Sequence, residues 1–208
     1  SLRGAFTTET DPDNQAAIVE ALGAVKDGES LKILIEVATD QAREETLRAT
    51  ALDTLAQFRG ADVLRARFSL VYDVKTPPSL IARAIPPLVK DGALPQNDLA
   101  GFFEHASAEV RAAAIASLMI TSQVTPDDRR SVIARLDDPS SDVRQAALAV
   151  IGSLQIHEAI PRLISDLNRP NFELRSQTIA ALCQMPDRRA EAIYRMASTD
   201  PDPAISRD

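Results

Sequence analysis

Four arginines recur at one helical register, and their spacing is the pattern in this sequence that could support binding. When the repeated apolar patterns of the chain are aligned, the four fall at or next to one column, between apolar positions rather than on them. A planar guanidinium donates two parallel hydrogen bonds to a carboxylate or a phosphate. A row of them along one surface could therefore clamp an acidic ligand. The column consists of Arg65, Arg130, Arg162 and Arg195.

Acidic residues close to this column support a second interpretation. Arginines and carboxylates a few positions apart pair on solvated helix faces, where each pair contributes little. An ion-paired helix face and a ligand-binding groove leave the same sequence pattern, so both interpretations stay open, and the ion-paired face is favoured. The neighbouring acids are Asp62, Asp128, Glu158, Asp166 and Glu191.

The elements that would position these arginines are short helices arranged in pairs. Residues 139–169 are the clearest pair, because Val143 and Ile151 lie on one apolar stripe at helical spacing and Ile160 and Leu167 lie on a second. Neither helix could bury its stripe alone. A pair this short needs the same pair stacked on either side, which is how a solenoid forms its core.

The same helix pair recurs along the chain at a nearly constant period. Val110, Val143 and Leu174 occupy the first core position of successive repeats, 33 and 31 residues apart. We therefore expect an all-α solenoid of about six stacked antiparallel helix pairs, forming a single repeat domain over 1–208. A partial seventh repeat suggests a fragment of a longer protein. Repeats 1 to 6 span about 11–40, 41–74, 75–106, 107–138, 139–169 and 170–200, and the partial repeat spans 201–208.

The third repeat is the least regular of these. Pro86-Pro87 lies where the periodicity places the middle of its first helix. An interior proline removes a backbone hydrogen bond and clashes with the preceding turn. We therefore expect a kinked or shortened helix there.

The clearest repeat also resembles a known family. Residues 138–154, which begin Asp-Pro-Ser-Ser-Asp-Val-Arg, and residues 158–167 closely resemble a HEAT repeat, specifically the HEAT-like subtype first named for phycobilisome lyases. The resemblance is strong in repeats 4 to 6 and looser in repeats 1 to 3. It implies a right-handed superhelix whose second helices line a concave surface, and a general role as a scaffold or protein-binding module.

The resemblance also assigns a role to a second set of arginines. These follow the first core position of their repeats by one residue, and in HEAT families such arginines bond to acidic or carbonyl groups of the neighbouring repeat. We expect the same structural linkage here, with Asp142 as a partner. The second set consists of Arg48, Arg111, Arg144 and Arg175.

The sequence predicts neither a catalytic site nor a metal or cofactor site. His157-Glu158 resembles the His-Glu dipeptides of deoxyhypusine hydroxylases, which are HEAT-like enzymes holding two irons, but a di-iron site needs several such dipeptides. The other histidine, His105, follows its glutamate instead of preceding it. A phosphate-binding glycine loop, a Ser/His/Asp set and paired cysteines are all lacking, and Cys183 is expected to be a buried apolar residue.

Composition narrows the classes of partner. The formal net charge is -7, which disfavours nucleic-acid binding because that binding depends on a basic surface. No run of about 18 apolar residues suggests a membrane span. We expect a soluble segment without evident membrane contact, and the sequence does not distinguish the cytoplasm from the periplasm.

Two functions fit these patterns. The first is a non-catalytic scaffold that holds a protein or peptide on the concave face of the solenoid. The alternative is an accessory repeat domain of a larger bacterial enzyme, a lyase or a redox protein, whose catalytic part lies outside this chain.

Overall fold

The computed structural model describes residues 2–121, 123–169 and 173–198, and these residues form helices and turns without a β-strand. The chain divides into two compact units, Ser1–Leu99 and Ala100–Asp208, called here the N-terminal and C-terminal units. The partial repeat 201–208 lies outside the described residues.

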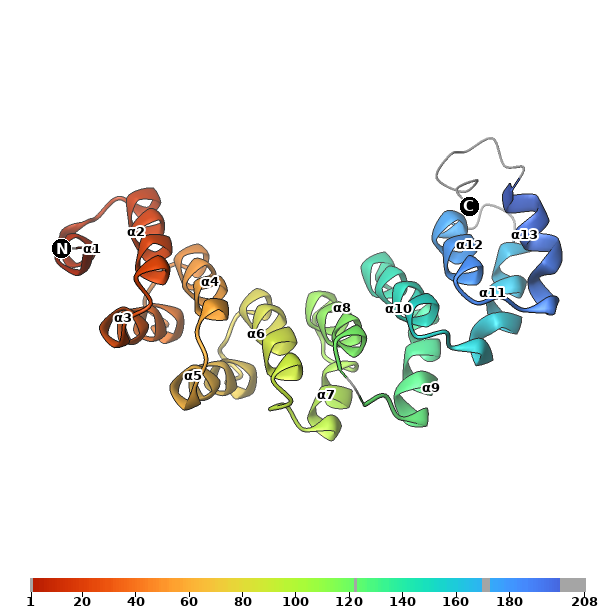
Figure 1. Cartoon of the computed structure of the whole chain (residues 1–208), viewed down its shortest axis with the longest axis horizontal. Helices are drawn as coiled ribbons and strands as arrows, with labels where there is room; N and C mark the ends of the chain where they lie inside the picture. Colours follow the sequence, from red (N-terminus) through yellow and green to blue (C-terminus); the bar gives the residue numbers. More distant parts are fainter. Residues whose placement is uncertain (1, 122, 170–172, 199–208) are drawn as a thin grey trace. The chain divides into compact units, whose positions relative to one another are not determined.

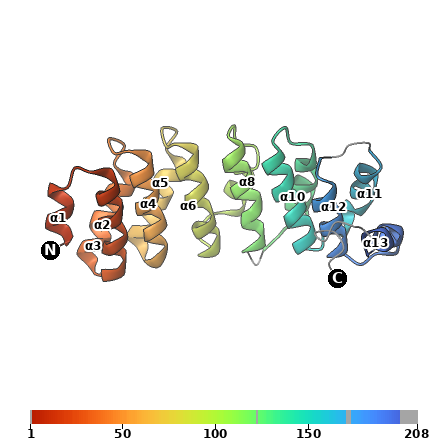
Figure 2. The same cartoon turned by 90° about the horizontal axis from the view of Figure 1, so that it is seen from above.

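In the N-terminal unit the helices form two rows. The first helices of the repeats, α2, α4 and α6, pack in sequence, and the second helices α3 and α5 pack on each other and on the first row (Figure 1). Figure 2 shows α2, α4 and α6 side by side. The helices are α1 (Leu2–Thr8), α2 (Pro12–Val25), α3 (Gly28–Thr39), α4 (Glu45–Thr54), α5 (Ala61–Tyr72) and α6 (Pro78–Lys90), and α7 (Gln96–Phe102) spans the boundary between the units.

The C-terminal unit repeats this arrangement. Its first helices α8, α10 and α12 pack in sequence, and α9 packs on α10 as α11 and α13 pack on α12. The helical repeat solenoid predicted from the sequence is confirmed, whereas the superhelical hand and the concave surface stay predictions. The helices are α8 (Ala108–Ala116), α9 (Pro126–Ala134), α10 (Ser141–Ser153), α11 (Ile160–Leu167), α12 (Arg175–Cys183) and α13 (Glu191–Ser198).

Short polar residues determine where several helices begin. The Asp11 carboxylate accepts hydrogen bonds from the amides of Asp13 and Asn14, and Pro12 supplies a first helical residue that needs no amide partner. At α9, Thr125 and Asp128 form a reciprocal capping box. Each cap of this kind contributes about 1 kcal/mol to stability.

The apolar stripes of the repeats form the core of each unit. Val19, Leu34 and Leu55 are fully buried in the N-terminal unit, as are Val143 and Leu163 in the C-terminal unit. Among the described residues, none of the helices has the length and apolar content that a bilayer span requires.

Two local features differ from what the sequence suggested, the length of one helix and the burial of one cysteine. The helix around Pro86 and Pro87 is not shortened, because α6 continues to Lys90 and its residues Ile85 and Leu88 are fully buried. Burial of this face outweighs the lost backbone hydrogen bonds. Cys183 is exposed rather than buried, since it is the last residue of α12.

Candidate functional site

A groove lies between the second helices α3 and α5 of the N-terminal unit. Its volume is ≈ 690 Å³, within the range of ligand-binding pockets. Its apolar lining consists of Leu31, Ile35 and Ala66, of which the first two are only half-buried. Apolar side chains left partly open by the neighbouring helix favour the binding of another apolar group. The rest of the lining consists of Gly28 and the polar residues Lys32, Glu36, Thr39, Asp62, Arg65 and Ser69.

The charges around the groove are not equally balanced. Arg65 forms an ion pair with Asp62 on the same helix, and the Lys32 ammonium lies 3.3 Å from the Glu29 carboxylate. The Glu36 carboxylate has no hydrogen-bond or ion-pair partner within 2–121, 123–169 and 173–198. Glu36 therefore carries the unbalanced charge of the groove.

An aromatic pair lies on α5 beyond the groove. The rings of Phe68 and Tyr72 are stacked, with centroids 6.0 Å apart. The Tyr72 hydroxyl donates a hydrogen bond to the Asp98 carboxylate. Partial burial and this acidic neighbour raise the pKa of Tyr72 to about 12, so the phenol is neutral at physiological pH.

Three arginines of the predicted column behave as an ion-paired helix face. Each is largely exposed, with 74 to 79% of its side chain accessible, and each pairs with an acid on its own helix. Such pairs contribute little to stability, and they partly neutralise the charge that a ligand would meet. The pairs are Arg65–Asp62, Arg130–Asp127 and Arg195–Glu191.

Arg162, the fourth member of the column, links two repeats. Its Nη1 and Nη2 donate to the Asp137 carboxylate at 2.9 and 2.5 Å, and its Nε donates to Asp166 at 2.9 Å. Asp137 ends the short 3-10 turn that follows α9, whereas Arg162 lies in α11. The hydrogen bond with Asp137 raises the pKa of Arg162, and its donation lowers the pKa of Asp137. Arg162 therefore connects successive second helices.

The second set of arginines reaches backbone carbonyl groups of preceding repeats. In the N-terminal unit, the buried Arg48 donates through Nε to the Ala38 carbonyl oxygen at 3.2 Å. In the C-terminal unit, Arg175 donates to the Leu167 carbonyl oxygen at 3.1 Å. Carbonyl acceptors at the end of the preceding second helix satisfy a buried guanidinium at little cost.

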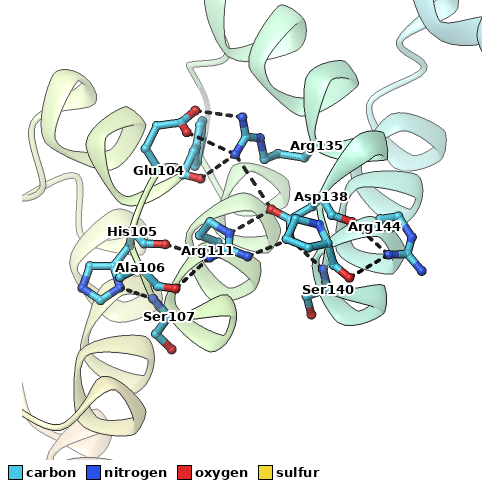
Figure 3. A network of polar contacts seen from close by, with 11 residues as sticks. Glu104, His105, Ala106, Ser107, Arg111, Arg135, Asp138, Ser140 and Arg144 are labelled. Atoms are coloured by element: carbon cyan, nitrogen blue, oxygen red, sulfur yellow. Dashed lines mark hydrogen bonds and ion pairs between the residues drawn. The ribbon is translucent and has the colours of Figure 1, made fainter.

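Arg111 and Arg144 extend this pattern into a network of side chains (Figure 3). Arg111 donates through Nε and Nη2 to both carboxylate oxygens of Asp138, at 2.8 and 2.7 Å, and through Nη1 to the His105 carbonyl oxygen at 2.8 Å. Arg144 donates to the Asp138 carbonyl oxygen at 2.9 Å and to the Glu173 carboxylate at 2.8 Å. Asp138 is thus held from both sides.

The acidic partner in this network is not the residue that the sequence suggested. Asp142 was expected beside the arginines, but it is exposed in the first turn of α10, where a negative charge interacts favourably with the helix dipole. Asp138 takes the predicted role because it lies between α8 and α10. Burial raises the pKa of Asp138, but the hydrogen bonds from Arg111 and from the Ser140 amide outweigh this effect, so its pKa lies below its usual value.

His157 and Glu158 point to different partners. The Nδ1 atom of His157 lies 2.7 Å from the Gln155 carbonyl oxygen, whereas the Glu158 carboxylate lies 3.7 Å from the Arg129 guanidinium. The described part of the chain contains no group of three or more His, Cys, Asp or Glu side chains arranged to hold a metal ion.

Sequence reasoning missed most of the groove. It identified Arg65, but it assigned Leu31 and Ile35 to the apolar stripe of their helix without showing that both are partly open. It also overlooked Glu36 of α3 and Ser69 of α5, whose only signal is a position beside the apolar stripe of each helix. Asp138 belonged to the Asp-Pro signature and could have been selected from it.

Comparison with known proteins gives similarities of fold. The sequence matches no family model and no curated protein. Human deoxyhypusine hydroxylase in complex with glycerol is similar in structure with a TM-score of 0.43 and 17% identity, over 95% of this chain and 77% of that chain. A designed armadillo repeat protein gives a TM-score of 0.47 and 20% identity, over 89% of this chain and 100% of that chain.

Proposed function

We propose that this chain is a non-catalytic protein-binding module whose second-helix face receives a peptide segment of a partner protein in the α3–α5 groove. The observation that carries the proposal is the groove itself, with half-buried Leu31 and Ile35 beside exposed polar residues. An apolar centre with a polar rim is the common composition of a protein interface. The module acts by binding, and its arginine networks serve the stack rather than a reaction.

We also propose that the chain belongs to the HEAT-like subtype first named for phycobilisome lyases. The support comes from the Val-Arg signature, since Arg111 and Arg144 both use their guanidinium groups to link neighbouring repeats. This assignment concerns the repeat and not lyase activity.

The position of Arg65 suggests its contribution to binding. Arg65 lines the groove, and about three quarters of its side chain is exposed while it pairs with Asp62. Its aliphatic stem can cover part of a bound apolar side chain while the guanidinium stays in water. Arg162 is excluded from this role because Asp137 and Asp166 occupy its donors.

Selection of peptides followed by blocking of the groove tests the proposal. A displayed library of random 12-residue peptides is selected against the full chain, and the affinity of the enriched peptides is measured by fluorescence anisotropy. Ser69→Trp places a large ring in the groove at an exposed position of α5. We expect this variant to weaken binding at least tenfold, because the ring takes the space of the ligand.

Ala17→Trp is the matched control, since Ala17 is exposed on α2 and does not line the groove. It should bind the selected peptides as the unmodified chain does, and circular dichroism should show both variants to be equally helical. Failure to enrich any peptide, or equal binding by the Ser69→Trp and Ala17→Trp variants, would contradict the proposed function.

A further inference from the structure

We infer that the α3–α5 groove selects a peptide in which a large apolar side chain is accompanied by a lysine or arginine, and that Glu36 receives this cation. The inference rests on the proposed function and adds the chemistry of the partner to it. The apolar requirement follows from Leu31, Ile35 and Ala66, and the cationic requirement follows from the distribution of charge along the groove.

The two ends of the groove differ because α3 and α5 run in the same direction through successive repeats. Gly28 and Asp62 line the end at which both helices begin, whereas Thr39 and Ser69 line the end toward which both run. Helix amino ends carry partial positive charge and carboxyl ends partial negative charge. The groove therefore has an electronegative end before any side chain is considered.

Cations at the beginning of the groove are already occupied. Arg65 pairs with Asp62, and Lys32 pairs with Glu29 at 3.3 Å. An acidic peptide would have to compete with these carboxylates for each cation. Arg65, the arginine of the column that lines this groove, is therefore poorly suited to clamp an acidic ligand.

Two carboxylates toward the other end have no cationic partner within the described residues, whereas Asp40, directly after α3, pairs with Arg43 at 3.3 Å. Glu36 lines the groove and has no partner among the residues that the structure describes. Asp73, directly after α5, accepts hydrogen bonds from the Gln41 side-chain amide at 2.7 Å and the Lys75 backbone amide at 2.9 Å, which are neutral donors. Together with the two helix ends, these groups give the carboxyl end of the groove a net negative field. A lysine or arginine on the ligand complements that field, whereas a carboxylate is repelled.

Selection from the same peptide library tests this specificity. We expect the enriched peptides to carry lysine or arginine within about four residues of a large apolar side chain, a distance within the reach of one turn of a bound peptide. One enriched peptide is then synthesised in three forms, with its basic residue kept, replaced by glutamine or replaced by glutamate. The glutamine form should bind about two- to fivefold more weakly, as expected for one exposed ion pair.

Glu36→Lys should reverse the preference. The basic peptide should bind about tenfold more weakly to this variant, and the glutamate form should bind more tightly to it than to the unmodified chain. Glu20→Lys is the matched control, because Glu20 is exposed on α2 outside the groove and its replacement changes the net charge equally. That control should retain the original preference. Raising the salt concentration should weaken binding of the basic form and leave the glutamine form nearly unchanged.

The outcomes of these experiments distinguish failure of the basic-peptide inference from failure of the proposed peptide-binding function. Peptides that are blocked by Ser69→Trp but show no basic preference, or are indifferent to Glu36→Lys, would overturn the inference and leave the proposed function intact. Peptides that bind regardless of Ser69→Trp, or a library without enriched peptides, would overturn both.

Discussion

The space between successive second helices differs between the two units, although both carry an arginine of the same column there. In the N-terminal unit, Arg65 pairs with Asp62 on its own helix and a groove lies between α3 and α5. In the C-terminal unit, Arg162 of α11 donates to Asp137 at the end of the segment that follows α9. One repeated position therefore serves an open surface in one unit and a structural link in the other.

The location of the neighbouring acid explains this difference. Asp137 precedes Arg162 by 25 residues, and Asp40 precedes Arg65 by the same number. Asp40, however, pairs with Arg43 at 3.3 Å. A competing arginine three positions away thus occupies the acid of the N-terminal unit. The position of an arginine in the repeat therefore does not decide whether it links two repeats. The other arginines that can pair with the same acid must also be known.

The largest expected effect on stability concerns the Arg111–Asp138 pair of the C-terminal unit. The corresponding arginine of the N-terminal unit, Arg48, binds a backbone carbonyl oxygen instead of a carboxylate. Asp138→Asn removes the charge that faces Arg111, and only 1% of the Asp138 side chain is exposed. Because a buried guanidinium loses its counter-ion, we expect the free energy of unfolding to fall by about 3 kcal/mol. Chemical denaturation measures this change.

Asp142→Asn is the control for this substitution, since Asp142 is exposed in the first turn of the same α10. It should cost no more than about 0.5 kcal/mol, in line with the small effect of a charge near a helix end. Equal costs for the two substitutions would show that Asp138 does not link the repeats.

A smaller effect should separate the two arginines of the column. Arg162→Met keeps the aliphatic stem but removes the hydrogen bonds to Asp137 and Asp166, which should cost about 1–2 kcal/mol after allowance for partial exposure. Arg65→Met should change the free energy of unfolding by less than about 0.5 kcal/mol, because its pair with Asp62 is exposed. If denaturation gave the same loss for both, the contrast between the two units would be wrong.

Acid should weaken the C-terminal network before it affects uncharged packing. The pKa of Asp138 and that of Asp137 are lower in the folded protein than in the unfolded chain. Each carboxylate therefore stabilises the fold above its unfolded pKa of about 4, and this contribution is lost as pH falls through the folded value. The melting temperature of the unmodified chain should fall below about pH 4, and its advantage over the Asp138→Asn variant should shrink there. A constant difference from pH 7 to pH 2.5 would contradict this assignment.

The sequence predicted the helices better than it predicted the contacts between them. Periodicity located the apolar stripes of the second helices, including Leu31 and Leu34, because burial in a solenoid follows the helical period. It did not show that Leu34 is fully buried while Leu31 is half-open. That difference depends on how closely the next helix approaches, which depends on side chains in another repeat.

The candidate site residues were only partly predicted, because their contacts also depend on side chains in another repeat. The arginine columns were visible in the sequence, but their partners were not, since Asp127, Asp137 and Asp138 belong to one repeat and the sequence does not show which of them each arginine reaches. The chosen partner Asp142 has the right charge and the wrong position. A shortened helix at Pro86-Pro87 was one of two expected outcomes, yet α6 continues because its packing outweighs this local preference.

The placement of Asp138 between two repeats affects how the C-terminal unit unfolds. Its carboxylate is bound by Arg111 of α8, and its carbonyl oxygen is bound by Arg144 of α10. Stacked repeats behave as a one-dimensional array in which the interaction between neighbours sets the cooperativity of unfolding. Fraying of α10 would withdraw the Ser140 amide and the Arg144 guanidinium from Asp138, the residue that pairs with Arg111 in the adjacent repeat. We therefore expect this single residue to couple repeats 4 and 5, so that partly unfolded states separating them are rarely populated.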